Sequence, residues 1–258
     1  SSSAAEVLPG RALSCDALLT IGSSSCDLTW TDPDDTAIIH YAAGADGVTR
    51  GVELTHANVV LSAAIVADRL LHLGAEERAL AALPLCDAAN QTWLMHAPLY
   101  AGGAVILLSN AADDKLVEAL ASDGDSFLLA SPSLLAALLA RRVGVTRRPP
   151  RARCICLGEG VGQPMLTAWE ERYRLPVATG FGAAETCGLA TFSPFDAVRA
   201  RSIGRAVWGV DARILDESGK PVAQGKTGEL CLRGCSIMKR YHRAEPATAH
   251  AFRHGWFH

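Results

Sequence analysis

Residues 151–182 read RARCICLGEGVGQPMLTAWEERYRLPVATGFG. A strand-like run at 151–158 comes first, an amphipathic stretch follows at 163–174, and a second apolar run occupies 176–182. Short apolar runs are typical of buried strands, and the stretch between them has helical character. The order strand, helix, strand predicts two parallel strands in one sheet, with the helix packed across them.

The same alternation extends toward the N-terminus. Short apolar runs predict strands at 36–42, 77–85, 103–109 and 126–131, and helical patterns lie at 57–74, 91–102, 113–124 and 132–144. The helix at 57–74 has Thr55 or Asn58 as its possible N-cap and Gly74 as its end. This part of the chain therefore predicts an α/β fold, a mostly parallel sheet flanked by helices.

Past residue 195 the pattern changes. Apolar positions alternate around turn clusters in ARILDESGKPVAQGKTGELCLRG, residues 212–234, which is typical of a β-hairpin. We therefore expect a small antiparallel β subdomain after the α/β unit. The predicted organisation is an N-terminal segment at 1–30, an α/β subdomain at 31–195, and an incomplete β subdomain at 196–258.

The composition is that of an ordinary globular protein. Of the 258 residues 49% are hydrophobic and 20% charged, and the formal net charge of −3 gives no reason to expect nucleic acid or an anionic membrane as a partner. No apolar stretch reaches the roughly 20 residues of a membrane span, and the opening residues do not resemble a signal peptide. The eight cysteines lie in apolar surroundings without C-x-x-C spacing, which predicts reduced thiols and a cytoplasmic location.

Three short patterns suggest sites and are weighed against plainer interpretations. The GKT of residues 225–227 has the wrong spacing and strand flanks for a nucleotide P-loop. Gly158, Gly160 and Gly162 between a strand and a helix suggest a dinucleotide fingerprint, but Gln163 stands at its final small position. The histidines at 250, 254 and 258 are spaced for a zinc-binding helix face, yet Gly255 interrupts that helix, which favours surface histidines.

Residues 40–51, HYAAGADGVTRG, pose a sharper question. A glycine-rich turn that follows a strand can gather backbone N–H groups around a phosphate. Here alanines occupy positions where hydroxyls would help, and Asp46 lies in the middle of the turn. The turn is therefore either a nucleotide loop, a degenerate one, or a plain turn.

Four segments together resemble the adenylate-forming superfamily, whose members include acyl-CoA synthetases and 4-coumarate–CoA ligases. The family loop Y-T-S-G-T-T-G-x-P-K-G followed by V-x-x-T-H-x-N is matched in residues 36–60 by Tyr41, Gly44, Gly47, Gly51, Val52, Thr55, His56 and Asn58. The other three segments are 83–108, similar to the acid-binding helix region, 178–194, similar to Y-G-x-T-E, and 202–258, with its Gly-Glu-Leu and Gly-Trp-Phe landmarks. The resemblance spans residues 30–258 and implies that the α/β subdomain at 31–195 is a nucleotide- and acyl-binding subdomain.

The resemblance implies ATP-dependent activation of a carboxylic acid to an acyl-adenylate and then to a thioester. It implies ATP or AMP and Mg²⁺ as ligands, coenzyme A or another thiol carrier as acceptor, and a carrier protein as a further partner. The implied nucleotide-binding residues are Gly44, Gly47, Gly51, Gly158, Glu159, Gly160, Thr179, Gly180, Phe181, Gly182 and Ala184. Glu185 would hold the metal and act with Arg50 in catalysis, and Phe181 would stack on adenine.

The sequence also departs from the family pattern. Ala42, Ala43 and Ala45 replace hydroxyl residues, Ala184 replaces the threonine before Glu185, and Arg50 replaces lysine. Asp46 brings negative charge to a loop that should hold a polyanion. The family's T-G-D would follow residue 258, so we expect the sequence to be the central piece of a longer enzyme with a diminished nucleotide site.

Substrate and activity remain open between alternatives. Asp87 and Asn90 are the candidate substrate-binding residues, and Asp87 either holds a cationic group of the substrate or caps a helix. The isolated chain is expected to be incomplete or weakly active as an acid–thiol ligase. The alternatives are a non-catalytic module that binds a ligand or a partner protein, an amino-acid adenylation domain, and a dinucleotide-binding domain.

Overall fold

The computed structural model describes residues 14–23, 25, 27, 29–44, 46–108, 114–121, 126–141, 152–158 and 161–258. The chain divides into two compact units, residues 1–32 and 33–258. The first contains the short helix α1 (Cys15–Ile21), and the second contains all the elements discussed below. A further division after residue 195 stays a prediction.

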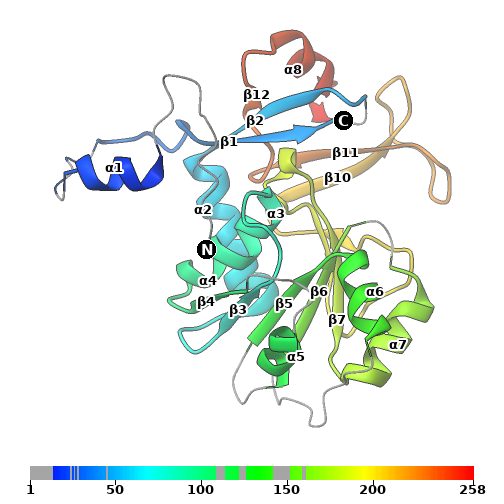
Figure 1. Cartoon of the computed structure of the whole chain (residues 1–258). Helices are drawn as coiled ribbons and strands as arrows, with labels where there is room; N and C mark the ends of the chain where they lie inside the picture. Colours follow the sequence, from blue (N-terminus) through cyan, green and yellow to red (C-terminus); the bar gives the residue numbers. More distant parts are fainter. Residues whose placement is uncertain are drawn as a thin grey trace. The chain divides into compact units, whose positions relative to one another are not determined.

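A seven-stranded sheet forms the centre of the second unit (Figure 1). Its order is β4-β3-β5-β6-β7-β8-β9, in which the first five strands are parallel and the last two antiparallel. Its strands are β3 (Arg78–Ala81), β4 (Ala104–Leu107), β5 (Ser126–Ala130), β6 (Arg153–Leu157), β7 (Val177–Phe181), β8 (Thr191–Ser193) and β9 (Arg205–Ala206). The expected α/β fold with a mostly parallel sheet is confirmed. The antiparallel edge formed by β8 and β9 was not predicted.

Both faces of this sheet are covered by helices. On one face lie α2 (His56–Ala64), the π-helical η1 (Ile65–Leu71), α3 (Ala88–Gln91), the π-helical η2 (Thr92–His96) and α4 (Ala97–Tyr100). On the other lie α5 (Asp114–Ala121), α6 (Pro132–Ala140) and α7 (Gln163–Tyr173). Successive strand side chains point to opposite faces, so Phe127 and Leu129 join the first core and Leu128 the second. The central strands are apolar throughout because both faces are buried.

The glycine-rich turn lies outside the central sheet. Residues 36–42 were expected to be a strand of the α/β unit; instead β1 (Thr36–Ala43) pairs antiparallel with β2 (Thr49–Thr55), and β2 pairs with β12 (Arg240–Tyr241). Because only five residues connect β1 and β2, the two strands pair with each other as a hairpin. At its end Thr55 caps α2 and Asn58 closes the capping box. The helical run ends at His72 in a left-handed conformation rather than at Gly74.

A second antiparallel sheet follows, with strand order β10-β11-β14-β13. It comprises β10 (Val210–Leu215), β11 (Glu229–Gly234), β13 (Phe252–Arg253) and β14 (Trp256–Phe257), with α8 (Glu245–Ala251) before the last two strands. The GKT pattern falls in the connection between β10 and β11, so no helix follows it as a P-loop requires. No helix in the described ranges is both long and apolar enough to cross a bilayer.

Candidate functional site

Three backbone N–H groups of the turn between β1 and β2 are hydrogen-bonded within the turn. The Gly44 N–H donates to the Val48 carbonyl (3.0 Å), and the Gly47 N–H donates to the Gly44 carbonyl (2.9 Å). The Val48 N–H donates to Oδ1 of Asp46 (3.1 Å). Gly47 has a φ of +76°, a conformation that favours glycine. The turn thus has the glycine geometry of an anion-binding loop, while three of its N–H groups are directed inward.

Asp46 and Arg50 form a two-bond ion pair inside the turn. The Arg50 guanidinium donates from Nη1 to Oδ1 (2.9 Å) and from Nη2 to Oδ2 (2.6 Å) of Asp46. A Cβ on Gly44 would lie 2.7 Å from Arg50 Nη1, so a larger residue at this position would require the guanidinium to shift. The hydrogen bonds from Arg50 and from the backbone of Val48 hold the pKa of Asp46 well below its usual range. The Asp46 carboxylate is therefore ionised and holds the Arg50 guanidinium in place.

Arg50 also links the loop to the motif that contains Glu185. Its guanidinium carbon lies 5.7 Å from the centroid of the Tyr241 ring, a cation–π contact. The Tyr241 hydroxyl donates to Oε1 of Glu185 (2.9 Å), and the Glu185 carbonyl accepts from the Met238 N–H (2.8 Å). Burial and the nearby Glu185 carboxylate raise the pKa of Tyr241, so its hydroxyl stays a donor. The loop and Glu185 thus belong to one connected site.

Glu53 holds Tyr241 in this position. Its side chain is only 3% exposed and accepts hydrogen bonds from Arg240 (2.9 Å) and Thr36 (3.0 Å), while His242 Nδ1 lies 2.7 Å from its other oxygen. Burial raises the pKa of Glu53, but the bonds from His242, Thr36 and Arg240 outweigh it and lower the pKa overall. One buried carboxylate thereby ties β1, β2 and β12 together.

The segment around Glu185 is shaped by close backbone contacts. Glu185 lies in the 3₁₀ turn η3 (Ala184–Thr186), directly after β7. A Cβ on Gly182 would lie 2.2 Å from the backbone carbon of Gly188, so the chain folds back on itself there. The Thr186 hydroxyl accepts from the Ala183 N–H (2.8 Å) and fixes the turn. These contacts hold the Glu185 carboxylate beside Tyr241.

Other predicted nucleotide residues lie along β7 and its end. Thr179 is buried, and its hydroxyl has no hydrogen-bond partner within the described ranges. Gly180 and Phe181 complete the strand, and Phe181 is half-buried against the first core rather than freely exposed. Gly51 faces Tyr41 across the hairpin. Gly158 follows β6 with a φ of +130°, whereas Glu159 and Gly160 lie outside the described residues.

Asp87 takes the plainer of its two expected roles in this structure. Its Oδ1 accepts from the N–H groups of Ala89 (2.9 Å) and Asn90 (3.1 Å), so it is the N-cap of α3. The Asn90 side chain is buried and donates to the Pro84 carbonyl (2.9 Å). Both side chains therefore stabilise the start of the helix, and their contact with a substrate stays a prediction.

One expectation about the histidines is wrong. His258 is not a surface residue, because its side chain is only 4% exposed and lies between β11 and β13. Its Nδ1 lies 2.8 Å from Glu229 Oε2 and 3.3 Å from Cys231 Sγ, and its Nε2 lies 3.1 Å from the Arg253 carbonyl. Helix α8 ends at Ala251, so the three histidines share no helix face.

Two residues of the site were not found by sequence reasoning. Tyr241 and Glu53 lie 56 and more than 100 residues from Glu185, and only the folded chain brings them to it. The signal for Tyr241 was its place in the C-terminal segment that resembles the family. Glu53 carried a signal too, as an acid between the apolar residues Val52 and Leu54.

The donor set at this site suits a divalent cation bound together with phosphate. Glu185 Oε1 accepts from Tyr241, and Glu185 Oε2 makes no hydrogen bond to the described part of the chain. Mg²⁺ is usually held by one or two carboxylates, with phosphate oxygens and water completing its octahedron. Glu185 is therefore the residue that would hold Mg²⁺, which would neutralise phosphate charge there.

Comparison with known proteins identifies related sequences. The family model described as AMP-binding enzyme matches residues 4–242. A 2-succinylbenzoate–CoA ligase of Geobacillus kaustophilus is 33% identical over 257 residues, which are 96% of this chain and 50% of that protein. A sulfoacetate–CoA ligase of Cupriavidus necator is 33% identical over 229 residues, which are 87% of this chain and 44% of that protein. The chain thus spans about half the length of the curated relatives it matches.

Solved structures show the same fold. ATP-bound MatB from Rhodopseudomonas palustris superposes with a TM-score of 0.85 at 25% identity, covering 94% of this chain and 48% of that one. The O-succinylbenzoate coenzyme A synthetase of Bacillus subtilis, in complex with ATP and magnesium, superposes with a TM-score of 0.81 at 24% identity and covers 94% and 50%.

Proposed function

This chain belongs to the family of AMP-binding enzymes, and from that premise we propose that it forms the adenine-nucleotide part of an ATP-dependent acid–thiol ligase. The complete reaction would join a carboxylic acid to ATP as an acyl-adenylate with release of pyrophosphate, and then transfer the acyl group to a thiol. Coenzyme A is the proposed thiol, with a carrier protein as the alternative, and the cytoplasm is the proposed location. Relatives such as 2-succinylbenzoate–CoA ligase, sulfoacetate–CoA ligase and feruloyl-CoA synthase support this reaction class.

One observation carries the proposal. Asp46, Arg50, Tyr241 and Glu185 form a continuous chain of contacts from the glycine-rich turn to the acid of the Y-G-x-T-E-like segment. The two motifs were expected to face the same ligand, and unrelated motifs would have no reason to meet. A bound triphosphate would lie between the turn and Glu185, with Arg50 balancing its charge and Glu185 holding Mg²⁺.

The chain's own residues would orient the nucleotide rather than react with it. Arg50 would donate to phosphate oxygens when it is released from Asp46. Tyr241 would keep Glu185 in place by donating to Oε1 and so leave Oε2 for the metal. Phe181 would offer its ring face to the adenine. The attacking carboxylate would come from the acid substrate.

A second candidate function has its own support. The inward N–H groups of the turn and the Asp46–Arg50 pair are what a non-catalytic binding module would retain after losing nucleotide affinity. Calorimetric titration with ATP and Mg²⁺, and with a non-hydrolysable acyl-adenylate mimic, separates the two candidates. Saturable binding of either ligand supports the ligase lineage with a retained site, and the absence of heat with both supports the module.

Replacing Asp46 with asparagine is expected to strengthen ATP binding about 2- to 5-fold, a range that reflects the modest worth of an exposed ion pair. The substitution D46N removes the anion that now occupies both outer N–H groups of Arg50. Calorimetric titration with ATP and Mg²⁺ measures the change.

The matched control is Asp211→Asn. Asp211 also pairs with an arginine, Arg233 at 3.1 Å, but it lies on β10 outside the site. D211N should leave the ATP affinity unchanged. An unchanged or weaker ATP affinity in D46N would show that Asp46 does not compete with phosphate.

A further inference from the structure

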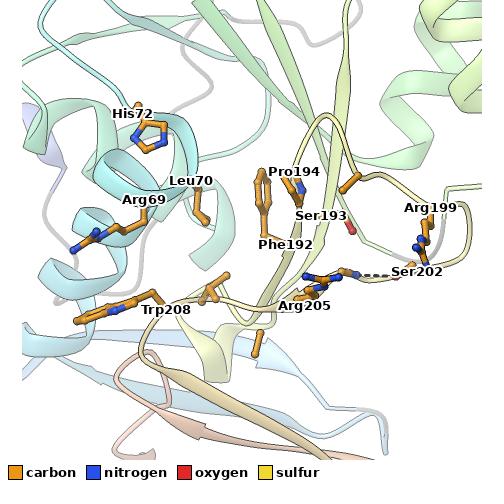
Figure 2. Close-up of a pocket in the computed structure, with 14 residues that line it drawn as sticks. Arg69, Leu70, His72, Phe192, Ser193, Pro194, Arg199, Ser202, Arg205 and Trp208 are labelled. Carbon is orange, nitrogen blue, oxygen red and sulfur yellow. Dashed lines mark hydrogen bonds between the residues drawn. The ribbon is translucent and has the colours of Figure 1, made fainter. Parts of the chain in front are cut away.

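A cavity of about 690 Å³ lies between the end of η1 and the β8–β9 edge of the central sheet (Figure 2). Figure 2 shows Arg69 beside Trp208, and the Arg69 guanidinium carbon lies 5.7 Å from the centroid of that ring, so the arginine covers it. Phe192 is buried, and the arginines that line the cavity are exposed. The described residues therefore offer a ligand neither an open aromatic face nor a buried charge at this cavity. A more compact group of polar atoms lies in the β10-β11-β14-β13 sheet.

Glu229, Cys231 and His258 bring three metal-ligating groups together in that sheet. Glu229 and Cys231 lie two residues apart on β11, so their side chains point to the same face. His258 follows β14 directly, and its N–H donates to the Ala251 carbonyl (2.9 Å), which fixes its backbone. A carboxylate oxygen, the thiol sulfur and a ring nitrogen all lie within 4.8 Å of one another. The strand pairing thus gathers an oxygen, a sulfur and a nitrogen ligand around one point.

The contacts of the His258 ring decide which nitrogen faces this point. Its Nε2 lies 3.1 Å from the Arg253 carbonyl, which can only accept, so Nε2 carries a proton and donates it there. In the neutral ring Nδ1 then has a lone pair, which faces Glu229 Oε2 at 2.8 Å and Cys231 Sγ at 3.3 Å. A lone pair so close to a carboxylate oxygen is repelled unless positive charge lies between them. A metal cation supplies that charge, and so does a second proton on the ring.

The cluster is shielded by two of its members and accessible at the third. Cys231 is buried and the His258 side chain is only 4% exposed, whereas the Glu229 side chain is 48% exposed. Glu229 Oε2 also accepts from Arg253 Nη2 at 3.3 Å. An exposed pair of this kind contributes little, so a bound cation would readily replace it. An ion therefore has a path to the buried thiol along the Glu229 carboxylate.

We propose that Glu229, Cys231 and His258 bind a zinc ion. Thiolate, imidazole and carboxylate are the protein ligands of Zn²⁺, and three of them leave the fourth tetrahedral position to water. Ligand atoms around tetrahedral zinc lie about 3.3–3.6 Å apart, and the half-exposed Glu229 carboxylate can shift to reach that spacing. The thiol proton passes to solvent as the zinc–sulfur bond forms. Mg²⁺ is not expected here, because it takes oxygen ligands in an octahedron.

The hydrogen bond on the far side of the imidazole supports this assignment. A histidine that binds a metal usually donates its other ring N–H to a carboxylate or a backbone carbonyl, which fixes the tautomer and the ring orientation. His258 makes this bond to the Arg253 carbonyl. The zinc ion would join β11 to the residue after β14 and so stabilise the sheet. The proposal is independent of the proposed nucleotide site, because Arg50, Tyr241 and Glu185 are not among the ligands.

The test is titration of the chelator-treated protein with Zn²⁺, and with Co²⁺ as a coloured substitute. We expect one Zn²⁺ per chain, and with Co²⁺ the visible absorption of a tetrahedral site together with a thiolate-to-cobalt charge-transfer band. Cys231→Ser should abolish that band. Glu229→Gln should weaken zinc binding at least about tenfold, since losing even a residue that only orients a metal ligand costs that much. Because Glu229 is exposed, E229Q remains informative if the variant at the buried Cys231 fails to fold.

Two matched controls exclude accidental binding. Cys86→Ser removes an exposed thiol, and His254→Asn removes a histidine whose ring centroid lies 6.1 Å from that of His258. Both residues lie outside the cluster, and both variants should bind zinc like the wild type. Asparagine is chosen because His254 has a φ of +52°, which asparagine tolerates.

Zinc should also raise the melting temperature of the wild type and raise that of E229Q less, because a ligand that binds only the folded chain stabilises it. A wild-type protein that gives no thiolate-to-cobalt band would overturn the proposal and leave His258 and Glu229 as an ordinary ion pair. Zinc affinity that stayed unchanged in E229Q, or that was lost in C86S, would overturn it too. Glu185→Gln should bind zinc like the wild type, so a failure of the nucleotide site does not affect this result.

Discussion

Glu185→Gln is expected to abolish the Mg²⁺ dependence of ATP binding and to weaken the ATP affinity at least about tenfold. Losing a residue that only orients a metal ligand already weakens metal binding about 10- to 100-fold, and losing the ligand itself should cost at least as much. Glutamine keeps the shape of the side chain and can still accept from the Tyr241 hydroxyl, which now donates to Glu185 at 2.9 Å. The substitution therefore removes the charge that would hold the cation and leaves the local fold in place.

The measurement is calorimetric titration with ATP, with Mg²⁺ and then with a chelator. The wild type should bind more tightly with Mg²⁺, whereas E185Q should bind equally weakly in both conditions. Glu217→Gln, in an exposed turn of the β subdomain, is the matched control and should behave like the wild type. If E185Q kept the Mg²⁺ dependence, Glu185 would not be the metal ligand.

Glu53→Gln is expected to destabilise the fold by about 3 kcal/mol. Breaking a buried ion pair from one side costs about 3–5 kcal/mol, and the lower end applies because Arg240 is 54% and His242 28% exposed. The variant would also loosen β12, and with it the contact of Tyr241 with Glu185. Urea unfolding at neutral pH measures the first effect.

The pH dependence of this loss follows from the lowered pKa of Glu53. A carboxyl whose pKa is lower in the folded than in the unfolded state stabilises the protein above its unfolded pKa, near 4.5. That contribution disappears as the pH falls through the folded-state pKa. The difference in unfolding free energy between the wild type and E53Q should therefore be full at pH 7 and shrink below about pH 4.

An exposed acid provides the control for this experiment. Glu118→Gln on α5 should change the stability by less than about 0.5 kcal/mol. A loss in E53Q no larger than this would mean that the buried carboxylate does not hold the three strands together. A loss that stayed constant down to pH 3 would mean that it acts by packing rather than by charge.

The central sheet could be predicted because its signals are local. The runs predicted as strands at 151–158 and 176–182 contain β6 and β7, and the helix between them begins after Gly162 as expected. Residues 36–42 do form a strand, as predicted. The prediction placed this strand in the central sheet, whereas it pairs with β2, because an apolar run does not show whether it pairs with the next strand or with a distant one. The antiparallel edge formed by β8 and β9 has strands too short for any periodic pattern.

The motifs of the candidate site could be found in the sequence, but the contacts between them could not. The sequence indicated that Asp46 lies near the expected phosphate position, but only the fold shows that its charge is matched by Arg50. Asp87 had two readings of similar merit, and the hydrogen bonds to Ala89 and Asn90 favour the cap. Tyr241 reaches Glu185 through the pairing of β12 with β2, a long-range contact that no local pattern contains.

The most direct test of the nucleotide site is photo-crosslinking with an azido-adenine derivative of ATP in the presence of Mg²⁺, followed by peptide mapping. We expect label on the hairpin of residues 40–51 or on residues 177–187, with labelling suppressed by unmodified ATP and strongly reduced in E185Q. Label confined to residues 193–208, or spread over the surface without competition by ATP, would contradict the assignment of the nucleotide to the site formed by Arg50 and Glu185.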